Sequence, residues 1–126
     1  MSSRQTPLHR VQGMGASHSG TGHFWRQRVT AAALVPLGLW FGFTVLGLAG
    51  SGEVAAVSYL AHPWNALLMG GFVTTMLYHM SLGLRVIIDD YVHSAGMKIS
   101  LLLLNLIVAF AIWVVCLFAI IRIAAL

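Results

Sequence analysis

Charged side chains are scarce in this 126-residue sequence. They make up only 8% of it, against roughly 25% in an ordinary soluble domain. Three of them are acidic, Glu53, Asp89 and Asp90, whereas 59% of all residues are apolar. So little polar surface cannot cover a water-exposed core, which excludes a soluble globular domain. The bilayer must be the solvent for much of the chain, as in an integral membrane protein.

Cysteine is almost absent too. The single Cys116 lies in an apolar run, so this chain can neither close an internal disulfide nor hold an iron–sulfur cluster by itself. No glycine-rich dinucleotide motif is present. Of the seven basic residues, four precede the first apolar run: Arg4, Arg10, Arg26 and Arg28. This placement indicates a membrane topology signal rather than a nucleic-acid-binding surface.

Three long apolar runs occupy residues 29–49, 65–88 and 99–121. Each is at least 21 residues long, and a helix needs about 20 to cross the hydrocarbon core. We therefore predict an all-α membrane protein with three transmembrane helices. Residues 1–24 are rich in Ser, Gly and His and have no hydrophobic period, so we expect a polar tail there. Residues 25–126 then form the three-helix anchor.

The basic residues also predict orientation. Residues 50–64 contain Glu53 but no Lys or Arg, whereas Arg85 and Lys98 flank the second connection. The positive-inside rule therefore places the N-terminus and the second connection on the cytoplasmic or matrix side, and the C-terminus opposite. Asn105 is a strongly polar side chain deep in the third span, and we expect it to make an interhelical hydrogen bond.

His79 carries the main chemical signal. It lies about two thirds of the way along the second span, where an ionisable side chain is costly and usually has a partner or a cofactor. A neutral imidazole is a good ligand for haem iron. A hydrogen bond to a neighbouring helix explains the position equally well. Five further residues share its helix face: Phe72, Met76, Gly83, Val86 and Asp90. Gly83, one turn after His79, leaves space for a flat ring.

A second polar group is predicted at the cytoplasmic end of the same span. It contains Arg85, Asp89, Asp90, Tyr91 and His93. A lipid-soluble substrate with polar oxygens would meet these side chains at the membrane boundary. The alternative is a charged interfacial cap, which we favour for Asp89. Arg28, at the same side of the membrane, suits either a carboxylate such as a haem propionate or a phospholipid contact.

Several of these residues occur at spacings that match a known protein family. The first span opens with Trp-Arg-Gln-Arg-Val-Thr-Ala at residues 25–31. In the second span His79 is followed a turn later by Gly83, and Asp90 and Tyr91 come eleven and twelve residues after it. Over about residues 24–122 the chain resembles the hydrophobic membrane anchor D subunit of succinate dehydrogenase, respiratory complex II, of the bacterial type.

The resemblance implies a role for each matched residue. His79 would be one axial ligand of a haem b whose second ligand is a histidine of the companion cytochrome b C subunit. Arg28 would lie near a haem propionate. Tyr91 would hydrogen-bond ubiquinone, and Asp90 would support the polar network of the quinone site. The chain would thus be a non-flavin subunit of an enzyme, with no complete active site of its own.

The resemblance also implies partners and a location. FAD and the iron–sulfur clusters would reside only on the flavoprotein and iron–sulfur subunits, and this chain would contact quinone and membrane lipids but no nucleic acid. The expected location is the bacterial inner membrane, rather than the mitochondrial one, with a cytoplasmic N-terminus. Two alternatives remain open: a small membrane transporter, and the haemless anchor of a fumarate reductase. The spans lack acidic residues, which disfavours a proton-coupled transporter.

Overall fold

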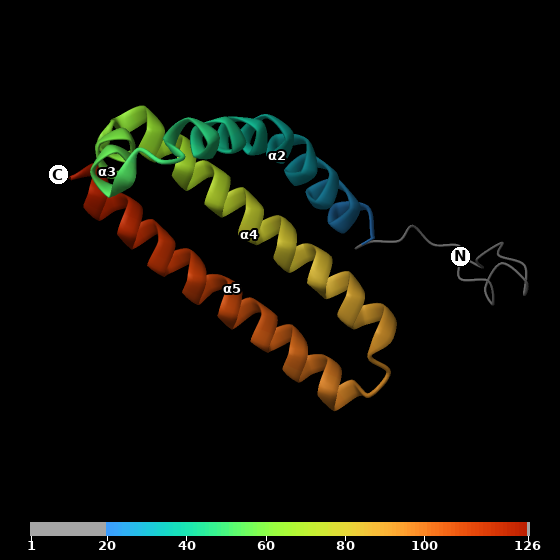
Figure 1. The fold of residues 1–126 in the computed structure, drawn as a ribbon. Coiled ribbons are helices and arrows are strands. Elements are labelled where there is room, and N and C mark those ends of the chain that lie inside the picture. Colours follow the sequence, from blue (N-terminus) through green and yellow to red (C-terminus); the bar gives the residue numbers. More distant parts are fainter. Residues whose placement is uncertain (1–19, 126) are drawn as a thin grey trace, which may run out of the picture.

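The computed structural model describes residues 20–125, which form four helices and no strand (Figure 1). In chain order these are α2 (Gly20–Leu48), α3 (Gly52–Ala61), α4 (Pro63–Tyr91) and α5 (Ala95–Ala124). Helices α2, α4 and α5 are each long and apolar enough to cross a membrane. The predicted all-α class with three spans is confirmed.

All three spans are longer than the sequence predicted, and α2 shows the largest difference. It begins at Gly20, whereas the apolar run begins at residue 29. Residues 20–24, expected in the polar tail, are therefore helical, and residues 1–19 of that tail lie outside the described part of the chain. Hydropathy marks only the part of a helix that lies in hydrocarbon, while backbone hydrogen bonds continue into the interface. Pro36 lies inside α2, and Figure 1 shows this helix bent along its length.

Helix α3 was not predicted, because residues 50–64 were expected to be a loop. Gly50 and Gly52 allow the sharp turn that separates it from α2, with φ angles of 81° and 80°. The Tyr59 hydroxyl lies 3.2 Å from the Thr44 hydroxyl of α2, and the Asn65 side chain of α4 donates to the Tyr59 carbonyl at 2.8 Å. The short helix is thereby tied to both neighbouring spans at one end of the molecule (Figure 1).

Helix α4 lies between the other two spans (Figure 1). It packs against α2 on one side and α5 on the other, and within residues 20–125 the backbones of α2 and α5 do not approach each other closely. The α2 contact includes the stacked rings of Phe41 and Phe72, whose centroids are 4.6 Å apart. The face of α4 that carries Phe72 and His79 is therefore the face that meets α2.

Two polar contacts join α4 to α5 within the apolar spans. The Asn105 side chain donates to the Ser81 carbonyl at 3.0 Å and to the Ser81 hydroxyl at 3.1 Å. The Trp113 indole donates to the Thr74 hydroxyl at 2.9 Å. The interhelical hydrogen bond predicted for Asn105 is confirmed, with Ser81 as its partner.

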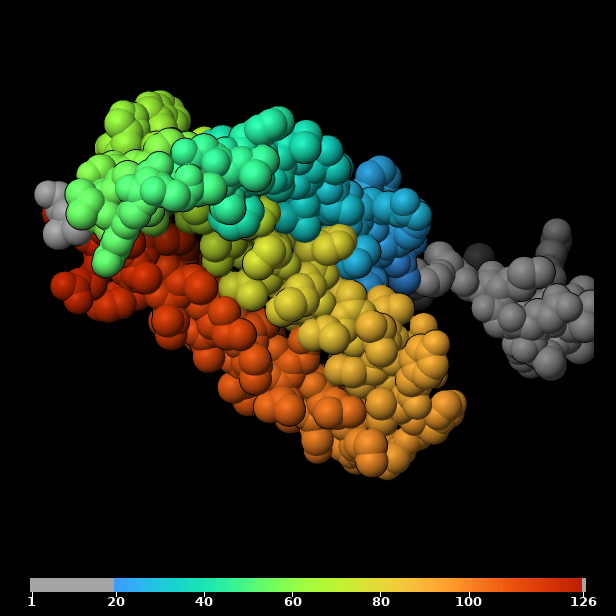
Figure 2. Space-filling view, in the orientation of Figure 1, coloured from blue at the N-terminus to red at the C-terminus, as the bar shows by residue number. Residues whose placement is uncertain are grey.

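The described residues bury very little of their apolar surface. Four apolar side chains are buried: Ala66, Leu77, Leu82 and Ile120. Large apolar side chains are exposed along every span, and Figure 2 shows the outer edge of α5 uncovered by the rest of the described chain. Such a surface is stable only against lipid tails or other apolar helices.

The antiparallel order of the spans yields a topology prediction. A phosphatase that is active only outside the cytoplasm should be active when fused after Ala56 and inactive when fused after Ala95, because the basic residues retain the second connection inside. A fluorescent protein that matures only in the cytoplasm, fused at the same points, serves as the control and should give the reverse pattern. A cytoplasmic position for Ala56 would contradict the three-span topology.

The Asn105 hydrogen bonds yield a stability prediction. Asn105→Leu keeps the branching at Cγ but removes both bonds to Ser81, so the free energy of unfolding in detergent should fall by about 0.6 to 1.7 kcal/mol. Ser100→Ala is the matched control, since the Ser100 hydroxyl bonds only to Gly96 of its own helix. Equal stability of the two variants would mean that the interhelical bond contributes nothing.

Candidate functional site

The N-terminal part of α2 and the middle of α4 form the main polar site, which is open on one side. His79 of α4 is half-buried there, and its Nδ1 lies 2.9 Å from the hydroxyl of Thr30 on α2. The same hydroxyl is 2.7 Å from the Arg26 carbonyl and 3.1 Å from the Gln27 carbonyl. Among residues 20–125, no hydrogen bond is made to Nε2 of His79.

A cavity of about 410 Å³ adjoins this contact, a volume within the usual range for ligand pockets. Its wall contains both polar and apolar side chains, which come from α2 and α4: Gly20, His23, Phe24, Gln27, Arg28, Ala31, His79 and Val86. Two buried polar atoms in this wall, Nε2 of His23 and Oε1 of Gln27, have no hydrogen-bond partner in the described structure. A buried polar atom without a partner costs free energy, so these two atoms are suited to a polar ligand.

Arg28 brings positive charge to the cavity. Its guanidinium group lies 5.1 Å from the centroid of the Phe24 ring, one turn earlier on α2. This cation–π contact holds the long side chain near the cavity wall, where an anionic group can pair with it. His79 and Arg28, which are far apart in the sequence, are therefore brought together in one site.

The predicted space beside Gly83 is partly filled. A methyl group built at Gly83 would lie 3.8 Å from the Nε2 atom of Gln27, an ordinary van der Waals contact. Gly83 is not part of the cavity wall, which passes from His79 to Val86 on this face of α4. The space expected at Gly83 is therefore reduced, because the Gln27 side chain of α2 lies near the glycine.

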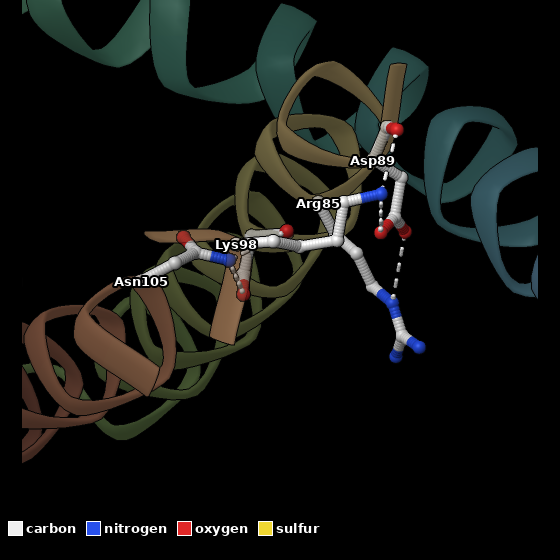
Figure 3. Close-up of polar contacts among 5 residues, drawn as sticks. Arg85, Asp89, Lys98 and Asn105 are labelled. Carbon is white, nitrogen blue, oxygen red and sulfur yellow. Dashed lines mark hydrogen bonds and ion pairs between the residues drawn. The ribbon is translucent and has the colours of Figure 1, made fainter. Parts of the chain in front are cut away.

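Asp89 belongs to a charged group at the end of α4. Its carboxylate lies 3.7 Å from Nε of Arg85 and 3.6 Å from Nζ of Lys98, and Lys98 also donates to the Asp89 carbonyl at 2.9 Å (Figure 3). Lys98 comes from the first turn of α5, so Asp89 joins the two helices across their connection. This arrangement supports the interfacial-cap interpretation of Asp89.

Asp90 and Tyr91 lie at the same end of α4 but outside the cavity. Both are exposed, Tyr91 with 78% of its surface accessible, and Asp90 makes no ion pair with the described residues. Because α4 is continuous from Pro63 to Tyr91, twelve residues separate His79 from Tyr91 by about 18 Å along the axis. The predicted residues thus occupy two places, one within the span and one at its boundary.

Sequence reasoning missed three polar residues of the site: His23 and Gln27, which line the cavity, and Thr30, which contacts His79 beside it. Their spacing of four and then three residues places them on one face of a helix. The sequence contains this spacing, but the first span was expected to begin at residue 29, which left His23 in the polar tail and Gln27 in the short segment before the span. His23 therefore lines the cavity together with His79, although the sequence indicated His79 alone.

The fold and the cavity define an all-helical membrane subunit whose polar site lies between its first two spans. The family model described as succinate dehydrogenase/fumarate reductase transmembrane subunit matches residues 2–120. The chain belongs to this family, and within it to the hydrophobic membrane anchor type. The match begins at residue 2, so it extends further toward the N-terminus than the resemblance over residues 24–122.

Curated relatives agree with this membership. The chain is 32% identical over 97 residues to the succinate dehydrogenase hydrophobic membrane anchor subunit of Paracoccus denitrificans, covering 77% of this chain and 75% of the relative. It is also 32% identical to the Rickettsia felis subunit of the same name, over 82% and 88% of the two chains. The Reclinomonas americana succinate dehydrogenase membrane anchor subunit is 31% identical over 72% and 78%. No solved structure matches the chain significantly.

Proposed function

We propose that this chain is the membrane anchor and cytochrome b subunit of succinate:ubiquinone oxidoreductase, complex II. The family membership and the names of the curated relatives support the assignment to succinate dehydrogenase. The location that fits is a bacterial inner membrane, with the N-terminal end of α2 on the cytoplasmic side. The chain would assemble there with the cytochrome b C subunit, the iron–sulfur subunit and the flavoprotein, because its own helices bury so little surface.

The haem assignment rests on the hydrogen bonding of the two ring nitrogens of His79. Its Nδ1 is engaged by Thr30, and Nε2 makes no bond with residues 20–125, as a histidine needs if it is to ligate iron. Arg28, in the same cavity, is suited to a propionate, and the walls at Phe24, Ala31 and Val86 suit an apolar ring. When bound, haem b supplies a one-electron redox centre. The residues present therefore fit this group.

The second iron ligand would come from the companion C subunit. His23 lines the same cavity and is the one other histidine of this chain that the described structure brings there. His23 precedes Thr30 by seven residues, or about 10 Å along α2, so it lies well away from the contact between Thr30 and His79. His23 is better suited to a polar substituent of the cofactor than to the iron that His79 would hold.

The quinone assignment rests on Tyr91 and Asp90. Asp89 is engaged by Arg85 and Lys98, whereas the neighbouring Asp90 carboxylate has no ion pair among the described residues. Tyr91 presents an exposed hydroxyl at the boundary, where a quinone oxygen, water and an adjoining iron–sulfur subunit can meet. Tyr91 would donate a hydrogen bond to the quinone, and Asp90 would accept or pass protons beside it.

Two alternatives were left open by the sequence, a small membrane transporter and the haemless anchor of a fumarate reductase. The transporter is set aside by the family membership. The haemless fumarate reductase anchor shares the family description, and it differs from our proposal in one measurable property, the presence of haem ligated by His79.

His79→Ala should abolish or strongly perturb the low-spin b-type spectrum of the purified complex, because the iron loses an axial ligand. The measurements are the pyridine haemochrome content, the optical spectrum and electron paramagnetic resonance. His62→Ala is the matched control, since His62 is the N-cap residue of α4, just before Pro63 and far from the cavity. His23→Ala should retain the low-spin signal.

An unchanged spectrum in the His79→Ala complex would show that His79 is not the ligand. Absence of haem from the wild-type complex would favour the haemless anchor instead.

Tyr91→Phe removes one hydroxyl and little volume, so it should lower quinone reductase activity about threefold to tenfold, the equivalent of one hydrogen bond. Succinate oxidation with a water-soluble dye that accepts electrons upstream should stay normal, because the flavin and clusters lie on other subunits. Tyr78→Phe, the same change in mid-span of the same helix, is the control and should be neutral. Loss of both activities would indicate a role in assembly, and loss of neither would remove Tyr91 from the quinone site.

A further inference from the structure

The Thr30 hydroxyl makes three close contacts. Its oxygen lies 2.7 Å from the Arg26 carbonyl, 3.1 Å from the Gln27 carbonyl and 2.9 Å from Nδ1 of His79. The first two contacts are within α2, and the third reaches α4. A threonine hydroxyl has only one hydrogen to donate, so these contacts cannot all be donated by Thr30.

The distances decide where that hydrogen lies. Two oxygens only 2.7 Å apart are at the usual separation of an O–H···O bond, and without a hydrogen between them they would repel. The hydrogen of Thr30 therefore points back to the carbonyls of its own helix, with Arg26 as the nearer acceptor. Such bonds to residues three and four positions earlier are common for threonine in helices. The Thr30 oxygen is then an acceptor toward His79.

It follows that Nδ1 of His79 is the donor in the contact with Thr30. A neutral imidazole carries one ring hydrogen, and a hydrogen on Nδ1 leaves a lone pair on Nε2. The opposite tautomer would place a hydrogen on Nε2, where it would block a metal bond. The hydroxyl on α2 thus selects the form of the α4 histidine that can act as a ligand.

We infer that Thr30 is a positioning residue for the haem ligand: it fixes His79 in the Nδ1–H tautomer, orients the ring and increases the electron donation of Nε2. This inference rests on the proposed function, since it specifies how this chain prepares the ligand. Histidine ligands generally donate their second ring hydrogen to an oxygen acceptor, which raises their basicity. Within residues 20–125 the oxygen that meets Nδ1 of His79 comes from Thr30, 49 residues away in the sequence and on another helix.

Threonine is also well suited because its side chain is stiff. Branching at Cβ restricts χ1 in a helix, and the bond to the Arg26 carbonyl fixes the hydroxyl further. The acceptor therefore has a defined position before the ligand binds.

The test compares Thr30→Val with Thr30→Ser in the assembled complex. Valine keeps the shape and removes the acceptor, so the haem midpoint potential should shift upward, because a weaker donor stabilises the ferric state less. The low-spin paramagnetic resonance signal should shift, and haem retention should weaken by on the order of tenfold. Serine keeps the hydroxyl and should restore all three properties. Thr44→Val is the control, as Thr44 bonds Tyr59 at the far end of α2.

Assembly is monitored by dye-linked succinate oxidation, and Thr30→Ala replaces Thr30→Val if the valine variant does not assemble. Suppose that the hydroxyl-free variant has a normal haem midpoint potential and a normal paramagnetic resonance signal, while His79→Ala loses the low-spin spectrum. This result would overturn the role of Thr30 and leave the proposed function intact. An unchanged spectrum in His79→Ala would overturn both. A shift shared by Thr30→Ser and Thr30→Val would show that packing, rather than the hydroxyl, is responsible.

Discussion

Water is absent along the spans, so each polar side chain there needs a partner inside the protein. Three such pairs join the helices within the described residues. Asn105 with Ser81, and Trp113 with Thr74, join α5 to α4, while Thr30 with His79 joins α2 to α4. Because every one of these contacts includes α4, this helix lies in the middle, and α2 and α5 need not touch within the described residues.

The central helix also sets the distance between the two parts of the proposed site. His79 lies in the span, where lipid and protein exclude water, and Tyr91 lies at the boundary, where protons are available. The α-helical rise fixes their separation at about 18 Å, and the unbroken helix makes it rigid. Asp89, held by Arg85 and Lys98, secures the end of α4 against α5, which leaves the adjoining Asp90 and Tyr91 exposed toward whatever covers this end.

The small amount of apolar surface that the described chain buries also has a physical reason. With only four apolar side chains buried, the described chain has almost no core of its own, and its exposed apolar faces are stable only in lipid or against other subunits. Membership in a family of transmembrane subunits explains this surface. The polar atoms of His23 and Gln27 that lack a partner in the cavity would be satisfied by the cofactor and companion subunit of the proposed complex.

The sequence by itself determined the number of spans, the depth of His79 and the interhelical role of Asn105, because hydropathy and the cost of polar groups in lipid are local properties. It misplaced the start of α2, since the polar residues from Gly20 onward continue the helix beyond the hydrocarbon, and it missed α3. Only the tertiary structure decided that Thr30 meets His79, that His23 and Arg28 share its cavity, and that Ser81 is the partner of Asn105. These contacts join different helices, and the register at which two helices pack depends on side-chain fit along their whole length rather than on any local pattern.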